Sequence, residues 1–243
     1  MREELQHLRV EEIGERAESG ATEPYFCRLS DDQLYLAKGK SALARGLMAE
    51  VLCGALGRAF GLPIPDFALA EIDPGLLQMN PGARASLGAD TLFASKHRDN
   101  LVQVSRDMLD AADPDLLHRL FLFDYWVKNG DRTGTIYGGN PNLFLDVGRD
   151  SLVVIDHNLA FDRSFDVEDH KRLHICRDFW FGLGRLRHDR AELLDDMSRA
   201  EAAIDGVEEV LPVEWMEADP AFIVEARQIL EARHRQVFWD ALR

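Results

Sequence analysis

Polar and apolar residues alternate over several short segments in the first hundred residues of the chain. Because the side chains of a strand point alternately to its two faces, each such segment predicts a strand. Polar turns separate the first three segments, and a stretch rich in glycine and proline, which we expect to be a loop, separates the last two. The pattern predicts a small antiparallel sheet of five strands, over residues 8–13, 25–29, 34–38, 67–72 and 91–95, with the loop at 73–88.

A different period follows the third strand. Apolar residues from Leu43 to Ala59 recur every three to four positions, and Gly61 with Pro63 ends the pattern. This spacing places the apolar side chains on one face of an α-helix. We therefore expect an amphipathic helix over residues 41–60.

Beyond Asp99 the pattern becomes mainly helical. A strongly apolar segment follows a helix-start signal at Asp113 and Pro114, and a hairpin-like pair of strands interrupts the helical texture later. Together with the sheet before it, this predicts an α+β chain of two lobes, residues 1–98 and 99–243. The second lobe is expected to contain helices over 115–129, 188–203 and 220–242, a loop over 130–141, and strands over 142–146 and 151–155.

Composition and charge narrow the possible partners. Of 243 residues, 46% are hydrophobic and 29% are charged, as in ordinary soluble proteins, and the formal net charge is −15 at pH 7. An acidic protein repels polyanions, so we expect neither direct nucleic-acid binding nor a membrane surface as partner. No apolar run is long enough for a membrane span, and the three cysteines show no disulfide or zinc-finger spacing. These features favour a cytoplasmic protein.

Three polar residues after the long apolar helix could carry chemistry. Asp131 lies in the predicted loop, Asn142 begins one strand of the hairpin, and Asp156 follows the other. Two carboxylates and one amide suit phosphoryl transfer, in which one Asp orients the attacking hydroxyl while Asn and Asp oxygens hold Mg²⁺. The alternative is that these residues only shape turns, as Asp and Asn commonly do.

Some of these segments resemble the HipA-like kinases, relatives of the protein kinases and phosphatidylinositol kinases. The resemblance is carried by Asp131-Arg132, by residues 140–144 (NPNLF) and by residues 155–161 (IDHNLAF). It implies a bilobal protein-kinase-like fold, with a sheet and one helix in the N-lobe, and ATP and Mg²⁺ in the cleft between the lobes.

The resemblance also implies roles for single residues. Asp131 matches the catalytic-loop aspartate, and Asp156 matches the metal-binding aspartate of the DFG position, although His157 replaces the phenylalanine. The metal-binding asparagine is Asn140 or Asn142. We favour Asn142, because Leu143 can begin the strand that anchors it.

A kinase of this type needs a lysine on a strand and an acidic partner on the following helix. Lys38 ends the third predicted strand, and Glu50 lies mid-helix among apolar residues, so we expect them to form the ion pair. Lys40 is a poorer candidate, since it lies beyond Gly39 and the strand. Taken alone, Lys38 and Glu50 could instead be ordinary solvent-facing residues.

A phosphate-covering loop is expected between the first two strands. Ser19, Gly20 and Thr22 offer hydroxyl groups and a flexible backbone there, although the segment could equally be a simple hairpin turn. The resemblance places the adenine-binding hinge at backbone groups of residues 94–97.

Other polar and aromatic residues have plainer interpretations. His170, His174 and Cys176 could offer one helix face to Zn²⁺, but solvated surface histidines fit the charged surroundings better. The cysteines are expected to be inert. The four tryptophans, with Phe179 and Phe181, are expected to pack in the core or a substrate groove.

The sequence thus predicts an ATP- and Mg²⁺-dependent kinase that transfers the γ-phosphoryl group to a hydroxyl, with a protein serine or threonine as acceptor by family analogy. Two alternatives stay open: a nucleotide-binding pseudokinase that serves as a regulatory interaction module, and AMP transfer on the same fold. The resemblance also implies an antitoxin-type or other regulatory protein as a possible partner.

Overall fold

The computed structural model describes residues 5–18, 22–88, 91–135, 138–182 and 189–243. Its N-terminal part contains all five expected strands, and they close into a barrel of order β1-β2-β3-β5-β4. The strands are β1 (Gln6–Arg16), β2 (Tyr25–Leu29), β3 (Leu34–Lys38), β4 (Phe67–Glu71) and β5 (Leu92–Lys96).

The barrel differs from the predicted antiparallel sheet in one pairing. Strands β1 and β4 are parallel, with Gln6 opposite Ala68 and Arg9 opposite Glu71, whereas the other four pairings are antiparallel. Strand β1 is longer than its apolar alternation because its first residues pair with β4 and its last ones with β2. This pairing closes the barrel around a small apolar interior that includes Cys27, Ala37 and Ala94.

The expected helix is present as α1 (Leu43–Ala59), after a short 3-10 turn, η1 (Lys40–Ala42). It ends where predicted, since Gly61 adopts a left-handed φ of 91° and its N–H donates to the Arg58 carbonyl. The helix is not amphipathic, because buried residues lie on all its sides. One side faces β5, and α8 and α10 cover the others.

The stretch predicted as a loop over 73–88 forms two short helices, α2 (Pro74–Met79) and α3 (Pro81–Leu87). Each proline occupies the first turn of its helix, where it has no N–H to lose. The side chain of Asp73 accepts from the N–H of Gly75, and that of Asn80 from the N–H of Ala83. The prolines that suggested a loop therefore start helices.

The rest of the chain combines a small sheet with helices. Strand β6 (Leu101–Gln103), which we did not predict, joins the expected hairpin of β7 (Leu143–Asp146) and β8 (Ser151–Val154). The long apolar helix is present but ends earlier than predicted, at Trp126, and Lys128 beyond it has a left-handed φ of 53°. The helices are α4 (Arg106–Ala111), α5 (Pro114–Trp126), α6 (Val167–Leu173), α7 (Arg177–Phe181), α8 (Arg190–Glu201), α9 (Val207–Val210), α10 (Val213–Ala218), α11 (Phe222–Glu231) and α12 (Gln236–Asp240), with 3-10 turns η2 (Ala202–Ile204) and η3 (Ala232–His234).

The single helix predicted over residues 220–242 is interrupted. Between α11 and α12, the Arg233 side chain turns into the core and donates to the Leu230 carbonyl, and Arg235 has an extended backbone. The indole N–H of Trp239 donates to the Arg233 carbonyl across this break. Burial of Arg233 and Trp239 therefore decides the helix boundary.

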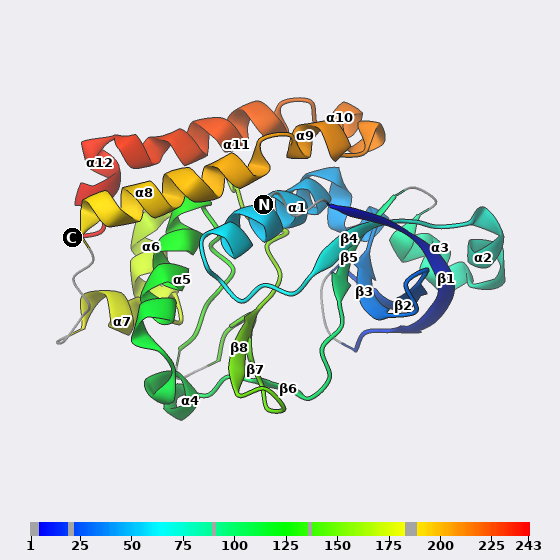
Figure 1. Cartoon of the computed structure of the whole chain (residues 1–243), viewed down its shortest axis with the longest axis horizontal. Coiled ribbons are helices and arrows are strands. Elements are labelled where there is room, and N and C mark those ends of the chain that lie inside the picture. Colours follow the sequence, from blue (N-terminus) through cyan, green and yellow to red (C-terminus); the bar gives the residue numbers. More distant parts are fainter. Residues whose placement is uncertain (1–4, 19–21, 89–90, 136–137, 183–188) are drawn as a thin grey trace.

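The barrel lies at one end of the molecule and α5, α6 and α7 at the other, while the C-terminal helices α8 to α12 run along one side, next to α1 (Figure 1). One continuous apolar core joins residues of α1, α5, α8, α11 and the β7–β8 hairpin. All four tryptophans are buried in the apolar interior, the first of the two places expected for them, and all three cysteines are buried there too. The lobe boundary at residue 98 stays a prediction. Within the described residues, no helix is both long and apolar enough to cross a bilayer.

Candidate functional site

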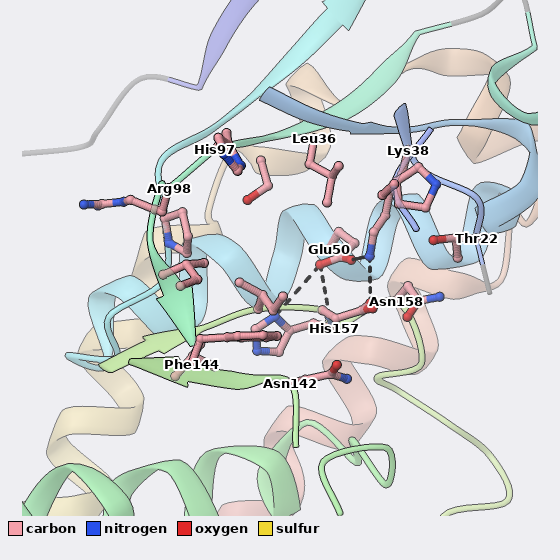
Figure 2. Close-up of a pocket in the computed structure, with 18 of the residues that line it drawn as sticks. Thr22, Leu36, Lys38, Glu50, His97, Arg98, Asn142, Phe144, His157 and Asn158 are labelled. Atoms are coloured by element: carbon pink, nitrogen blue, oxygen red, sulfur yellow. Dashed lines mark hydrogen bonds and ion pairs between the residues drawn. The ribbon is translucent and has the colours of Figure 1, made fainter. Parts of the chain in front are cut away.

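A cavity of about 940 Å³ lies between the barrel and the β6–β8 sheet. Its walls are apolar on both sides, with Leu36, Phe67 and Phe93 from the barrel facing Phe144 and Val154 from the hairpin. Figure 2 shows Leu36 and Phe144 on opposite sides of this space. Such a slot can hold a planar apolar ring system, and polar side chains gather at one end of it.

Lys38 connects two carboxylates at the polar end of the cavity. Its Nζ lies 2.6 Å from Glu50 Oε1 and 2.7 Å from Asp156 Oδ1. Strand β3 supplies the lysine, α1 supplies Glu50, and the segment after β8 supplies Asp156. Burial works against the charge on Lys38, but the two carboxylates outweigh it and raise its pKa. The structure therefore brings together a predicted ion pair and a residue 118 positions further along the chain.

Glu50 also fixes the residue after Asp156. Its Oε2 accepts the backbone N–H of His157 at 3.0 Å, as Figure 2 shows. Burial raises the pKa of Glu50, although Lys38 opposes that shift, whereas Lys38 outweighs burial at Asp156 and lowers its pKa. Lys38 therefore stabilises the ionised form of Asp156.

Asp131 lies on the opposite lobe, held by two asparagines. Its Oδ2 accepts from Asn140 Nδ2 at 2.7 Å and from Asn142 Nδ2 at 3.0 Å. Asn140 is exposed, whereas Asn142 is only 8% exposed and precedes β7, the place predicted for the metal-binding asparagine. Burial, followed by the charge of Asp156, raises the pKa of Asp131.

Asn142 and Asp156 share an unusual backbone conformation. Their φ angles are 44° and 60°, in the left-handed region that asparagine and aspartate tolerate better than most residues. Residues held in this region often lie at functional sites. The side-chain amide nitrogen of Asn142 donates to Asp131. Its side-chain oxygen, Oδ1, therefore points away from Asp131 and can serve another partner. One amide oxygen and one carboxylate are hard ligands that fit Mg²⁺ or Mn²⁺.

The remaining candidates differ in how the structure places them. Thr22 is buried and lines the cavity, but Ser19 and Gly20 lie outside the described residues. Lys40 is exposed and does not line the cavity, as expected of the poorer candidate. In the predicted hinge, the N–H groups of Lys96 and His97 donate to the carbonyls of Asp66 and Leu34, so the barrel engages these two backbone donors.

Sequence reasoning missed a buried polar network behind the site. Arg132, which is fully buried, lies 2.6 Å from Asp124 Oδ2 through Nε and 3.1 Å from His157 Nε2 through Nη2. Asp124 also accepts from Asn129 Nδ2 and contacts His174 Nε2. One signal was available: Asp124 is a carboxylate within a strongly apolar helix, and such a group needs buried partners.

The prediction that His170 and His174 are solvated surface residues is wrong. Both are buried because α6 packs on α5, where His170 Nε2 lies 3.2 Å from the Phe121 carbonyl and His174 Nδ1 accepts from the Cys176 N–H. Burial lowers the pKa of His170 to about 3. Both ring nitrogens of His174 and the Nε2 of His170 are thus engaged, and no group of three or more His, Cys, Asp or Glu suited to a metal was found in the described part of the chain.

Lys38 lies between Glu50 and Asp156 at the polar end of the cavity, and Asp131 lines the same cavity. This arrangement is typical of the class of protein-kinase-like phosphotransferases. A model of the HipA-like kinase family matches residues 10–242. The chain therefore belongs to the HipA-like kinase family, whose class of reaction is phosphoryl transfer. A search of curated proteins finds no match.

The chain is also similar to solved structures of kinases. The Golgi casein kinase crystallised with Mn and ADP has a TM-score of 0.51 at 13% identity, over 98% of this chain and 72% of that one. A proinflammatory kinase of Helicobacter pylori, CtkA, has a TM-score of 0.49 at 13% identity, over 95% and 94% of the two chains. The first likeness shows a kinase fold for this chain.

Proposed function

We propose that the protein transfers the γ-phosphoryl group of ATP, with Mg²⁺, to a serine or threonine hydroxyl of another protein. The observation that carries this proposal is the contact of Lys38 with both Glu50 and Asp156 at the polar end of the cavity. The divalent ion and ADP named for the Golgi casein kinase structure support the choice of cofactors.

Each polar residue has a task in this reaction. Lys38, oriented by Glu50, neutralises phosphate charge. Thr22, which lines the cavity, is proposed to help bind the phosphates, as are Ser19 and Gly20 from the sequence. Asn142 and Asp156 would hold Mg²⁺, which supplies charge neutralisation on the phosphates when bound.

Asp131 orients the acceptor hydroxyl. As the hydroxyl oxygen bonds to the γ-phosphorus, the bond from that phosphorus to the bridging oxygen breaks, ADP leaves, and the hydroxyl proton passes to Asp131. Its raised pKa helps it to accept a proton. A second cavity of about 290 Å³ also has Asp131 in its lining, which gives an acceptor a route to this carboxylate.

A protein acceptor suits the charge of the chain better than nucleic acid or a membrane, since the net charge is −15. We also propose that a regulatory protein of antitoxin type can be a second partner. A pull-down with the purified chain would identify either protein.

The test combines a measurement of ATP binding with the mass of the reaction products. We expect titration calorimetry to show ATP binding that Mg²⁺ strengthens, and Asp156→Asn to remove most of that gain. Intact mass after incubation with ATP and a mixture of cellular proteins should show phosphorylated products, and Asp131→Asn should abolish them. Asp150→Asn, at an exposed turn residue that also has a left-handed φ, is the matched control and should behave as wild type.

The outcomes separate the alternatives. ATP binding without any phosphorylated product would favour the pseudokinase. Products heavier by an AMP group would show adenylyl transfer instead. A protein that binds no nucleotide with or without Mg²⁺ would refute the proposal.

A further inference from the structure

The two segments that carry Asn142 and Asp156 meet on a single buried side chain. Arg132 Nη1 donates to the backbone carbonyl of Asn142 and, at 3.1 Å, to the carbonyl of Ile155, the residue before Asp156. The Ile155 N–H also donates to the Asn142 carbonyl at 3.1 Å. One guanidinium therefore ties the backbones of both candidate metal ligands together.

The guanidinium is itself held from two sides. Asp124 Oδ2 accepts from Nε at 2.6 Å, and His157 Nε2 lies 3.1 Å from Nη2. Because a guanidinium has only donors, His157 Nε2 must be the acceptor in this contact. The side chains of all three residues are at most 2% exposed, so no solvent competes for these bonds.

His157 extends this chain of contacts to the nucleotide side. Its backbone N–H donates to Glu50, which holds Lys38, while its ring faces Arg132. A phenylalanine at this position could fill the space but could not accept from Arg132. The replacement noted in the sequence thus creates a polar link that an aromatic hydrocarbon cannot make.

We propose that Arg132 is a positioning residue that fixes the separation of the Asn142 and Asp156 side chains, and that His157 holds the guanidinium in the orientation this requires. The inference rests on the proposed function, since it assumes that these two side chains bind the divalent ion. Groups behind the ligands of a metal commonly set metal affinity by orienting the ligands.

The experiment measures ATP affinity with Mg²⁺ and with EDTA, and the ratio of the two affinities is the metal-dependent gain. We expect His157→Phe and Arg132→Lys to lower this gain by roughly tenfold or more, with the affinity in EDTA unchanged. His157→Gln, which restores an acceptor, should recover much of the gain. A merely structural defect would lower both affinities together.

Arg233→Lys is the matched control. Arg233 is also buried and pairs with a carboxylate, Glu201, and a backbone carbonyl, that of Leu230, but it lies between α11 and α12. The Arg233→Lys substitution should change thermal stability and leave the metal-dependent gain in ATP affinity at its wild-type value. If Arg132→Lys fails to fold, the comparison of the metal-dependent gain between His157→Phe and His157→Gln tests the inference.

Three results would overturn the inference. An unchanged gain in His157→Phe would refute it alone, as would an equal fall of both affinities. A wild-type protein without any Mg²⁺-dependent gain would refute the proposed function, and this inference with it.

Discussion

Lys38 is central to the candidate site, because it is largely buried and contacts two carboxylates. Its side chain is 8% exposed, and those of Glu50 and Asp156 are 4% and 24% exposed. Two negative charges this close would repel each other without the lysine. Glu50 therefore has two tasks, to orient Lys38 and to hold the backbone of His157.

The substitution Glu50→Gln tests the first task. Glutamine can still accept the His157 N–H, but the charge that orients Lys38 is lost, so the lysine is shared only with Asp156. A hydrogen bond to a charged group is worth about 1.5–3 kcal/mol, which corresponds to roughly a ten- to hundredfold loss of affinity for Mg²⁺ and ATP. Titration calorimetry would measure it. Glu12→Gln, on the exposed side of β1, should have no effect, and an equal loss there would contradict the explanation.

At the scale of elements, α1 positions Glu50 by approaching the barrel closely. Gly54 makes this approach possible, since a Cβ added there would lie 2.5 Å from the ring of Phe67 on β4. Phe67 in turn lines the cavity. The glycine in the middle of the helix costs helix propensity, and the close contact between helix and sheet offsets that cost.

Gly54→Ala should therefore weaken both the fold and nucleotide binding. Overpacking of this kind costs about 1–3 kcal/mol, and displacement of Phe67 narrows or reshapes the slot. We expect a lower free energy of unfolding in urea and weaker ATP binding. Gly148→Ala, in the β7–β8 turn, meets only an ordinary contact with the Asp146 side chain and should change neither. Wild-type stability in Gly54→Ala would show that α1 can move without cost.

At the scale of the whole molecule, the C-terminal part has buried histidines instead of an entirely apolar interior. Burial lowers the pKa of both His157 and His170 to about 3, and burial also lowers the pKa of His174. The folded protein therefore keeps these rings neutral at a pH where the unfolded chain, with an ordinary histidine pKa of about 6.5, binds protons.

Stability should consequently fall as the pH decreases from about 6.5 toward 3, by about 1.4 kcal/mol per pH unit for each neutral buried histidine. Asp131, whose pKa is raised, acts in the opposite direction, so the comparison uses a variant. Below about pH 6.5, His170→Gln should reduce the slope of the unfolding free energy against pH by about 1.4 kcal/mol per pH unit. Urea unfolding between pH 5 and 7.5 measures it. Identical slopes in His170→Gln and wild type would contradict this account, and His234→Gln, at an exposed histidine, serves as control.

The sequence by itself determined the local elements and most of the polar residues of the candidate site. The five strands, α1 and the β7–β8 hairpin follow from hydrophobic period, which reflects how a helix or strand exposes its own side chains. Lys38 and Glu50 stood out at a strand end and within an apolar helix, where a polar group needs a reason. Asp131, Asn142 and Asp156 stood out around the predicted loop and hairpin, and the resemblance to the HipA-like kinases singled out all five. Their roles as ligands and catalytic groups stay predictions.

Tertiary structure decided what depends on residues far apart in the chain. The parallel pairing of β1 with β4, the burial of α1 on all sides and the break before α12 result from contacts that no local period records. The same holds for Arg132, whose neighbours come from two separate segments, Asp124 from α5 and both Ile155 and His157 from the stretch after β8. A buried charge is stable only where its partners converge, and only the folded chain brings them together.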